Sequence, residues 1–278
     1  MSATVTMLGV SRRSLAAIEE RLDALFADAG ADPLRVGEEL FSVVALLDRE
    51  SALRRVLSDP ALPANRKAGL AHALIEAQAA PATTELVEAA VRARWSRSRD
   101  LVDAVELLAI EAVLSAAERD GRLEDVEDEL FRFGRILKAQ PALRAALADR
   151  TVLADRKLAL LDTLLADRVH PATLRLVRQL VSQPRGRTLD DGLEDFSRLA
   201  AARRQRLIAY VETAVQLDEE HRGRLEAALT AAYGRGVRLN VEVVPDVIGG
   251  LRVRIGEEIL DGTVAYRLAE ARRRLAGG

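Results

Sequence analysis

The feature that most constrains the fold of this chain is a repeat of its own sequence at an offset of 90 residues. Without any gap, residues 40–100 match residues 130–190 at 21 of 61 positions, where two unrelated segments of this composition would share roughly 5. Short runs such as Pro81-Ala82-Thr83 return unchanged, in this case as Pro171-Ala172-Thr173. Self-similarity at a fixed period is typical of one structural unit used twice. The sequence therefore predicts two domains of one design.

The repeated unit has the pattern of consecutive amphipathic helices. Asp32 and Pro33 supply an N-cap and a proline at the first position of a helix, as helix starts require. We expect helices over residues 11–28, 33–47, 51–57, 63–78, 81–95 and 100–119. The last of these ends the first bundle and opens the second without a break, which predicts a rigid joint.

The remaining residues, 206–278, change to strand-like alternation. Apolar and polar residues alternate over 237–243 and again over 251–255, which is the period of a strand with one buried face. Residues 207–215 are rich in β-formers, and a helix from Asp218 to Gly234 separates them from the next strand. Thr263 is placed to cap a last helix. This order predicts a compact α/β unit of strand, helix, strand, hairpin and helix.

The expected fold class is mainly α with a small α/β C-terminal unit. Two tandem related helical bundles, at 1–105 and 106–205, precede the strand-helix-strand-hairpin-helix domain at 206–278. With 41 Lys+Arg against 43 Asp+Glu, the chain has no overall field to hold a nucleic-acid backbone. It has no Cys, hence no disulfide and no thiolate metal site. No stretch of 18 residues is apolar and uncharged, so no transmembrane helix is expected.

Groups that could carry catalysis do not converge anywhere in the sequence. His72, His170 and His221 are scattered and lack the spacing of metal ligands. Two neighbouring acids, Glu257 and Glu258, have no histidine, lysine or nucleophile near them and suit a hairpin tip. We therefore expect no catalytic residue, no metal and no cofactor.

One basic cluster leaves a different function open. It consists of Arg92, Arg94, Arg97 and Arg99 around Trp95. Arginines beside an aromatic ring can pair with and stack on RNA, and the helical bundle resembles that of RNA-binding antitermination factors. The alternatives to be weighed are thus an RNA-binding protein of that type, or a general helical adaptor.

A set of turn residues near the C-terminus carries a family resemblance. The set is Ile248, Gly249, Gly250, Gly256, Asp261, Gly262 and Thr263. Its order around an alternating strand and before a basic helix resembles the C-terminal signature of the delta subunit of bacterial F-type ATP synthase, called OSCP in mitochondria. Thr263 replaces the serine more usual in that family and keeps the capping hydroxyl.

The resemblance implies a non-catalytic stator subunit, which links the catalytic head of the ATP synthase to its peripheral stalk and resists the torque of the rotor. It implies two partners: N-terminal helices of alpha subunits, received in a groove between the first and fifth helices of the bundle, and b subunits of the stalk. The candidate groove residues here are Leu15, Ile18, Leu22, Leu86 and Val87.

The same resemblance places the chain at the cytoplasmic face of a bacterial plasma membrane, held there through the complex and without direct contact to nucleic acid. Family members usually have one bundle, so the resemblance also implies a lineage, expected among high-GC bacteria, in which the bundle was doubled. Sequence pattern alone does not say which of the two bundles receives the alpha-subunit helix.

Overall fold

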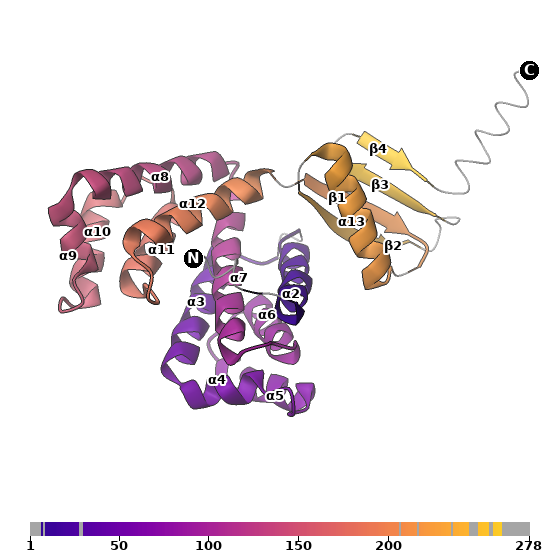
Figure 1. Ribbon diagram of the computed structural model, residues 1–278, viewed down its shortest axis with the longest axis horizontal. Coiled ribbons are helices and arrows are strands. Elements are labelled where there is room, and N and C mark those ends of the chain that lie inside the picture. Colours follow the sequence, from indigo (N-terminus) through magenta and orange to yellow (C-terminus); the bar gives the residue numbers. More distant parts are fainter. Residues whose placement is uncertain are drawn as a thin grey trace, which may run out of the picture. The chain divides into compact units, whose positions relative to one another are not determined.

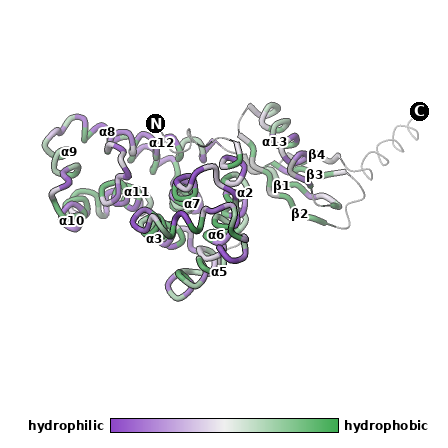
Figure 2. Tube along the Cα trace, turned by 60° about the horizontal axis from the view of Figure 1, so that its bottom comes forward, coloured by the Kyte–Doolittle hydropathy of each residue, from purple (hydrophilic) through white to green (hydrophobic). Residues whose placement is uncertain are grey.

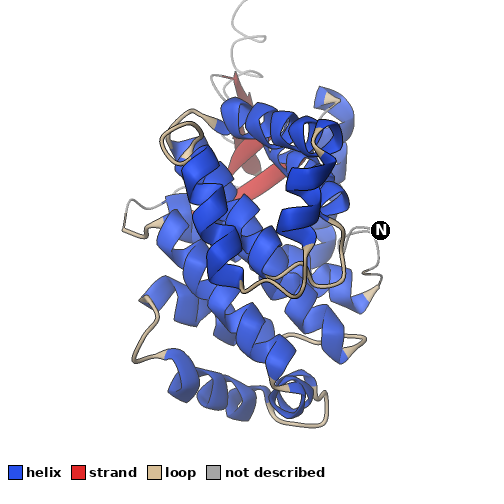
Figure 3. Ribbon diagram, turned by 90° about the vertical axis from the view of Figure 1, so that its left-hand side faces the viewer, coloured by secondary structure: helices blue, strands red, loops and turns tan. Residues whose placement is uncertain are grey.

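The computed structural model describes residues 7, 9–27, 30–205, 207–215, 217–234, 236–244, 250–255 and 258–262. The chain divides into two compact units, Met1–Arg204 and Gln205–Gly278 (Figure 1). Among the described residues, the first unit is built from helices, and all strands belong to the second (Figure 3). Each unit is described by itself below.

The helices of the first unit follow the sequence repeat closely. Their bounds are α2 Val10–Ala27, α3 Pro33–Arg49, α4 Ser51–Ser58, α5 Ala64–Ile75, α6 Pro81–Arg92, α7 Ser98–Arg119, α8 Leu123–Ala139, α9 Pro141–Ala148, α10 Ala154–Leu165, α11 Pro171–Ser182 and α12 Leu189–Gln205. Both ends of α3, α4, α5 and α6 recur in α8, α9, α10 and α11 after a shift of 90 residues. The two segments therefore form the same helices, as the repeat predicts.

Helix α7 belongs to both copies of the repeat. It packs along α3 and against α2 in the first copy, and it also packs against α11 of the second. A shift of 90 residues moves α2 onto residues 100–117, which lie within α7. The same helix is thus the last of the first bundle and the first of the second, and it runs uninterrupted for 22 residues.

A half-buried carboxylate fixes the start of the fifth helix in both copies. In the first copy Glu39 accepts hydrogen bonds from the Ala80 backbone N–H at 2.7 Å and the Thr83 hydroxyl at 2.6 Å. In the second copy the equivalent residues are Glu129, His170 and Thr173, joined in the same way. The first backbone N–H groups of a helix have no acceptor within the helix and need one from elsewhere. By supplying it, the glutamate ties α6 to α3 in the first copy and α11 to α8 in the second.

Close approach of α3 and α7 depends on one glycine. A Cβ at Gly37 would lie 2.6 Å from the Val113 Cγ2 and 3.0 Å from the Ala109 carbonyl oxygen. Asp32 caps the start of α3, as expected, by accepting from the Leu34 backbone N–H at 3.0 Å. The tube of Figure 2 alternates in hydropathy along the helices, consistent with one apolar face on most of them.

The second unit is a four-stranded mixed sheet with a helix. Its elements are β1 Leu207–Thr213, α13 Glu219–Tyr233, β2 Val237–Val243, β3 Leu251–Ile255 and β4 Glu258–Asp261. The strand order is β2-β1-β3-β4, with β1 parallel to β2 and the other pairs antiparallel. Asp218 caps α13, and Gly234 ends it with φ of 64°. The expected strand over 207–215 ends at Thr213.

Alternation along the strands sorts their residues between two faces. The buried core of this unit comprises Ala209, Val211, Leu229, Val237, Leu239, Val253 and Ile255. Leu229 comes from α13, so the helix covers this face of the sheet. Tyr210 and Arg254, which alternate with these residues, are exposed. The predicted one-sided burial is confirmed for residues 251–255, whereas Val243, at the end of the strand over 237–243, is 48% exposed.

The family signature is described only in part. Gly250 has φ of 82°, in the left-handed region that favours glycine. Gly262 donates its backbone N–H to the Leu251 carbonyl at 3.0 Å, and a Cβ there would lie 3.1 Å from the same oxygen. Asp261 pairs in register with Arg252. The other signature residues, Ile248, Gly249, Gly256 and Thr263, and the helix expected after them, lie outside the described residues.

Candidate docking surfaces

The five candidate groove residues lie in the core of the first bundle. Leu15, Ile18, Leu22, Leu86 and Val87 are each at most 5% exposed. Their helices, α2 and α6, run side by side: the Ser14 hydroxyl donates to the Arg94 carbonyl at 2.8 Å, and Arg21 pairs with Glu85 at 2.7 Å. A partner helix at this seam would meet the outer face of α2, where Ala17 and Ala24 are exposed.

The corresponding surface of the second copy is covered. No residue between Asp100 and Ala117, the part of α7 that corresponds to α2, is exposed. Helix α3 lies along α7 and also meets α11 (Figure 1). There Arg175 of α11 pairs with Glu38 at 3.4 Å, and its guanidinium lies 5.6 Å from the centre of the Phe41 ring. The first bundle thus occupies the outer surface of the second bundle's first and fifth helices.

Buried ion pairs hold the two copies together. Arg185, with 6% of its side chain exposed, reaches Asp48 at 2.6 Å, Asp103 at 2.7 Å and Glu106. Burial alone lowers the pKa of this guanidinium, but the three carboxylates outweigh it and raise the pKa above its ordinary value. The arginine belongs to the second copy and the acids to α3 and α7.

A second buried arginine extends this junction. Arg203 of α12 pairs with Glu111 and Glu118 of α7, each at 2.7 Å, and with Asp23 of α2 at 3.3 Å. Its pKa is raised, since the carboxylates overcome the lowering that burial causes. Removing one member of such a buried pair leaves an uncompensated charge. The two arginines therefore lock the second copy onto three helices of the first.

The basic cluster does not form an aromatic platform. Trp95 is 6% exposed, and its indole N–H donates to the Ala90 carbonyl at 2.8 Å. Two of the surrounding arginines are already paired: Arg92 with Glu88 at 2.7 Å and Arg97 with Asp100 at 2.9 Å. Because the indole faces are inside the bundle, bases have nothing to stack on, and the RNA-binding alternative loses the residue on which it depended.

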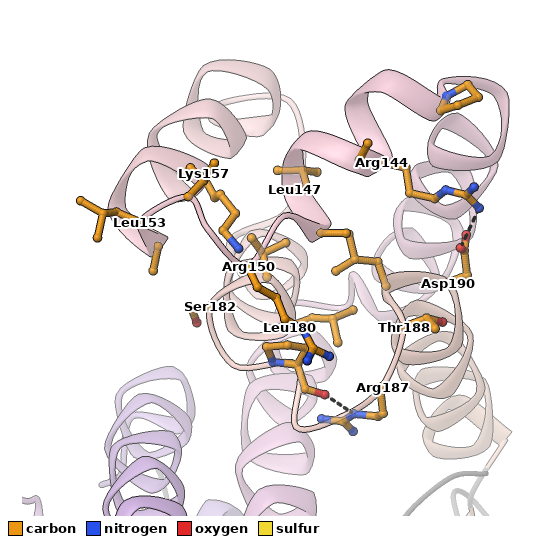
Figure 4. A pocket seen from close by; sticks show the side chains of 18 residues that line it. Arg144, Leu147, Arg150, Leu153, Lys157, Leu180, Ser182, Arg187, Thr188 and Asp190 are labelled. Carbon is orange, nitrogen blue, oxygen red and sulfur yellow. Dashed lines mark hydrogen bonds and ion pairs between the residues drawn. The ribbon is translucent and has the colours of Figure 1, made fainter.

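A pocket opens in the second bundle between α9, α10 and the start of α12 (Figure 4). Its volume is about 870 Å³, and Leu147, Leu180 and Leu189 are among its apolar lining residues. Arg150 and Lys157 also line it. No sequence motif marks this pocket, because its lining comes from residues that read as ordinary helix positions.

The sheet of the second unit presents a polar and aromatic row on the face away from its core. The register places Tyr210, Arg254 and Ile259 side by side on three neighbouring strands. The Arg254 guanidinium lies 4.9 Å from the Tyr210 ring centre, and Ile259 is 58% exposed. In the next row Arg252 pairs with Glu212 at 3.0 Å. This face is a candidate protein-binding surface.

Within the described residues, no helix is long and apolar enough to cross a membrane. The described part of the chain also holds no group of three or more His, Cys, Asp or Glu residues placed to bind a metal. The three histidines have structural partners: His72 meets Glu88 at 2.8 Å, His170 accepts from the Ala172 backbone N–H at 3.2 Å, and His221 meets Asp218 at 2.6 Å.

Comparison with known proteins gives the family. Residues 110–275 match the family model described as "ATP synthase delta (OSCP) subunit". The chain is 53% identical over 272 residues to "ATP synthase subunit delta" of Streptomyces avermitilis, covering 98% of this chain and 100% of that protein. The protein of that name from Thermobifida fusca is 51% identical over 271 residues, covering 98% of this chain and 100% of that protein.

A chain of the Toxoplasma gondii mitochondrial ATP synthase hexamer is 24% identical, with a TM-score of 0.29, and the match covers 60% of this chain and 94% of that one. A score this low carries no weight here. The chain combines helical bundles with a small sheet, and both carry candidate surfaces for binding other proteins. Its class is that of a non-catalytic subunit of a larger complex. The chain belongs to the ATP synthase delta (OSCP) subunit family. Its role is that of a stator subunit of ATP synthase, as the signature residues indicated.

The family match covers only part of the repeated region. It begins at residue 110, inside α7, and runs through the second copy and the C-terminal unit. The first copy lies before it. Because the two relatives align over their full length, they share the doubled plan.

Proposed function

We propose that the first bundle binds the N-terminal amphipathic helix of an alpha subunit, and that the C-terminal unit binds the b subunits of the peripheral stalk. The chain then acts at the cytoplasmic face of the bacterial plasma membrane as the link between head and stalk. It makes and breaks no bond. Its task is to hold the head still while the rotor turns inside it.

The observation that carries this proposal is the difference between α2 and α7. The family's groove lies between the first and fifth helices of a bundle, which are α2 and α6 in the first copy and α7 and α11 in the second. Helix α2 keeps an exposed face with Ala17 and Ala24, whereas residues 100–117 of α7 have none. Only the first copy leaves room for a helix to dock in this way.

This assignment changes the role of the groove residues. We propose that Leu15, Ile18 and Leu22 position α2 from the core, while the docking helix rests on the small outer residues of α2 and beside the Arg21–Glu85 pair, whose side chains are 54% and 38% exposed. Small residues allow two helices to approach closely, and apolar anchors from the partner then supply affinity.

The stalk end is supported by the open face of the sheet. Tyr210, Arg254 and Ile259 form an exposed row in which an aromatic ring, a cation and an aliphatic side chain adjoin. Aromatic residues and arginine are enriched where proteins bind each other. The buried ion pairs of Arg185 and Arg203 suit a link that must transmit torque without bending.

The experiment is co-purification of tagged variants with the ATP synthase of the source organism. Ala17→Glu with Ala24→Glu should lose the alpha subunits and retain the stalk, because two charges on the same face of α2, about two turns apart, block docking. Removal of residues 206–278 should lose the stalk subunits and retain the alpha subunits. The matched control is Ala159→Glu, at an exposed position of α10. Normal recovery of the head by the α2 variant would assign the alpha subunit to another surface.

A further inference from the structure

The junction between the two copies shows how this repeat is covered by a neighbour. Phe41 on α3 is 1% exposed. Arg175 of α11 covers it, with its guanidinium 5.6 Å from the ring centre, and also pairs with Glu38 at 3.4 Å. A guanidinium suits this place because it can lie on an aromatic face and pair with a carboxylate at the same time.

The second copy carries the equivalent residues on α8, and none of the described residues covers them as Arg175 covers Phe41; we call this surface the socket. A shift of 90 residues takes Phe41 to Phe131 and Glu38 to Asp128, both on α8. Phe131 is 59% exposed. Asp128 pairs only within its own helix in the described contacts, with Arg132 at 2.8 Å. An exposed aromatic ring can anchor a partner, since aromatic side chains contribute much of the binding energy of protein interfaces.

The charge at the C-terminal end of the socket differs from that at the equivalent position of the first copy. In the first copy Asp48 receives Arg185, ten residues after Arg175. At the equivalent position the second copy has Lys138, which is exposed. A second copy of this chain would therefore bring Arg185 against a lysine. Moreover, its own Arg175 and Arg185 are engaged at its own junction. The socket thus favours a different protein.

We propose that the α8 surface formed by Asp128, Phe131 and Lys138 docks a helix of another ATP synthase subunit. That helix carries an arginine, which covers Phe131 and pairs with Asp128, and it is followed by an acidic residue just beyond its C-terminal end, at the place of Arg185 after α11, which meets Lys138. The geometry is that of α11 on α3 with the second charge reversed. The residues of this surface differ from those of the α2 seam and of the sheet face. The inference rests on the proposed function only in taking the chain to be part of the ATP synthase complex.

Absence of cysteine from the chain allows a direct test. Phe131→Cys is introduced into the full chain, and the rate of maleimide labelling is compared between the free chain and the purified ATP synthase. We expect labelling to slow by at least about tenfold on assembly, because a docked helix must open to admit the reagent. Val56→Cys, at a position 41% exposed in the first copy, is the control and should stay reactive.

The occupant is then identified by photo-cross-linking with a benzophenone maleimide, attached to the single thiol of the Phe131→Cys variant in the assembled complex. A cross-linked helix with an arginine near the attachment point and an acid just beyond its C-terminal end supports the proposal. Lys138→Glu should weaken incorporation of the chain about tenfold, the effect of losing one interface hot spot. Phe131→Ser should likewise weaken incorporation of the chain into the complex. It should leave the urea midpoint of the free chain unchanged, whereas Phe41→Ser should lower that midpoint.

Three results would overturn the proposal. One is equal reactivity of the introduced thiol in the free and assembled chain, and another is a cross-linked segment that lacks the arginine. The third is protection that appears in the free chain as its concentration rises, which would make this a contact between two copies. Co-purification of the subunits is scored separately, so an assembled Phe131→Cys chain whose thiol stays reactive contradicts this inference and leaves the head-to-stalk role standing.

Discussion

Replacing Arg185 by methionine tests whether the junction is held by buried charge. Methionine keeps much of the volume and removes the guanidinium that three carboxylates share. Breaking a buried ion pair on one side costs about 3–5 kcal/mol. Glu106 is the most buried of the three acids, with 3% of its side chain exposed, and it keeps Arg187 as a partner. We therefore expect the low end, about 3 kcal/mol.

Urea unfolding followed by the fluorescence of Trp95 gives the measurement. Trp95 is the chain's single tryptophan and is buried in the first unit, so its signal reports that unit alone. With a slope of about 2–3 kcal/mol per molar urea, the midpoint should fall by roughly 1 M.

The control is Arg132→Met, whose side chain is 70% exposed and pairs with Asp128 on the surface of α8. An exposed pair of this kind contributes about 0–1 kcal/mol, so its midpoint should barely move. If Arg185→Met costs no more than this control, the carboxylates do not depend on the guanidinium, and the junction must be held by apolar packing.

Three further predictions concern the helices and the last turn of the sheet. Gly37→Ala should destabilise the first unit by about 1–3 kcal/mol, because the added methyl meets Val113 and the backbone of α7; Gly69→Ala, with open space around it in α5, should stabilise by up to about 1 kcal/mol, and both midpoints come from the same urea assay. Burial raises the pKa of Glu39, but the hydrogen bonds from Thr83 and Ala80 lower it by more. The net pKa of Glu39 is therefore below its ordinary value of 4.5. A lowered folded-state pKa gives stability that is present above pH 4.5 and lost as the pH falls through the folded value, so Glu39→Gln should cost about 1–2 kcal/mol at about pH 7 and progressively less as the pH falls through that value. A cost in acid equal to that at neutral pH would mean that the charge of Glu39 is irrelevant. Finally, Gly262→Ala should lower the thermal midpoint of the second unit, because its Cβ would press on the Leu251 carbonyl oxygen; an unchanged midpoint would show that the turn can open without loss.

Local signals in the sequence determined most of the fold. Asp32 and Pro33 fix the start of α3, and Gly234 fixes the end of α13, because capping depends on residues next to each other in the chain. The repeat then carried the helix bounds of one copy to the other. Alternation likewise separated the two faces of the strands.

Contacts between distant segments could not be predicted in the same way. Leu15 and Ile18 form a stripe that suits the core as well as a partner, and only the structure places them inside. Trp95 looked available among its arginines, yet its indole is covered. Glu106 and Arg185 lie 79 positions apart and carry no motif. Pairing of this kind depends on how the two copies pack, which no local pattern records.

The sharing of α7 sets a rule for how a chain of this design can gain or lose length. Each added bundle needs only five new helices, since the last helix of one serves as the first of the next. A recombination event that joins α2 to the matching point of α7 would remove 90 residues and restore a single bundle with no broken helix. The same event in reverse would make three. Genes of this plan should therefore differ in length by whole repeats, with their crossover points inside the first or last helix of a bundle.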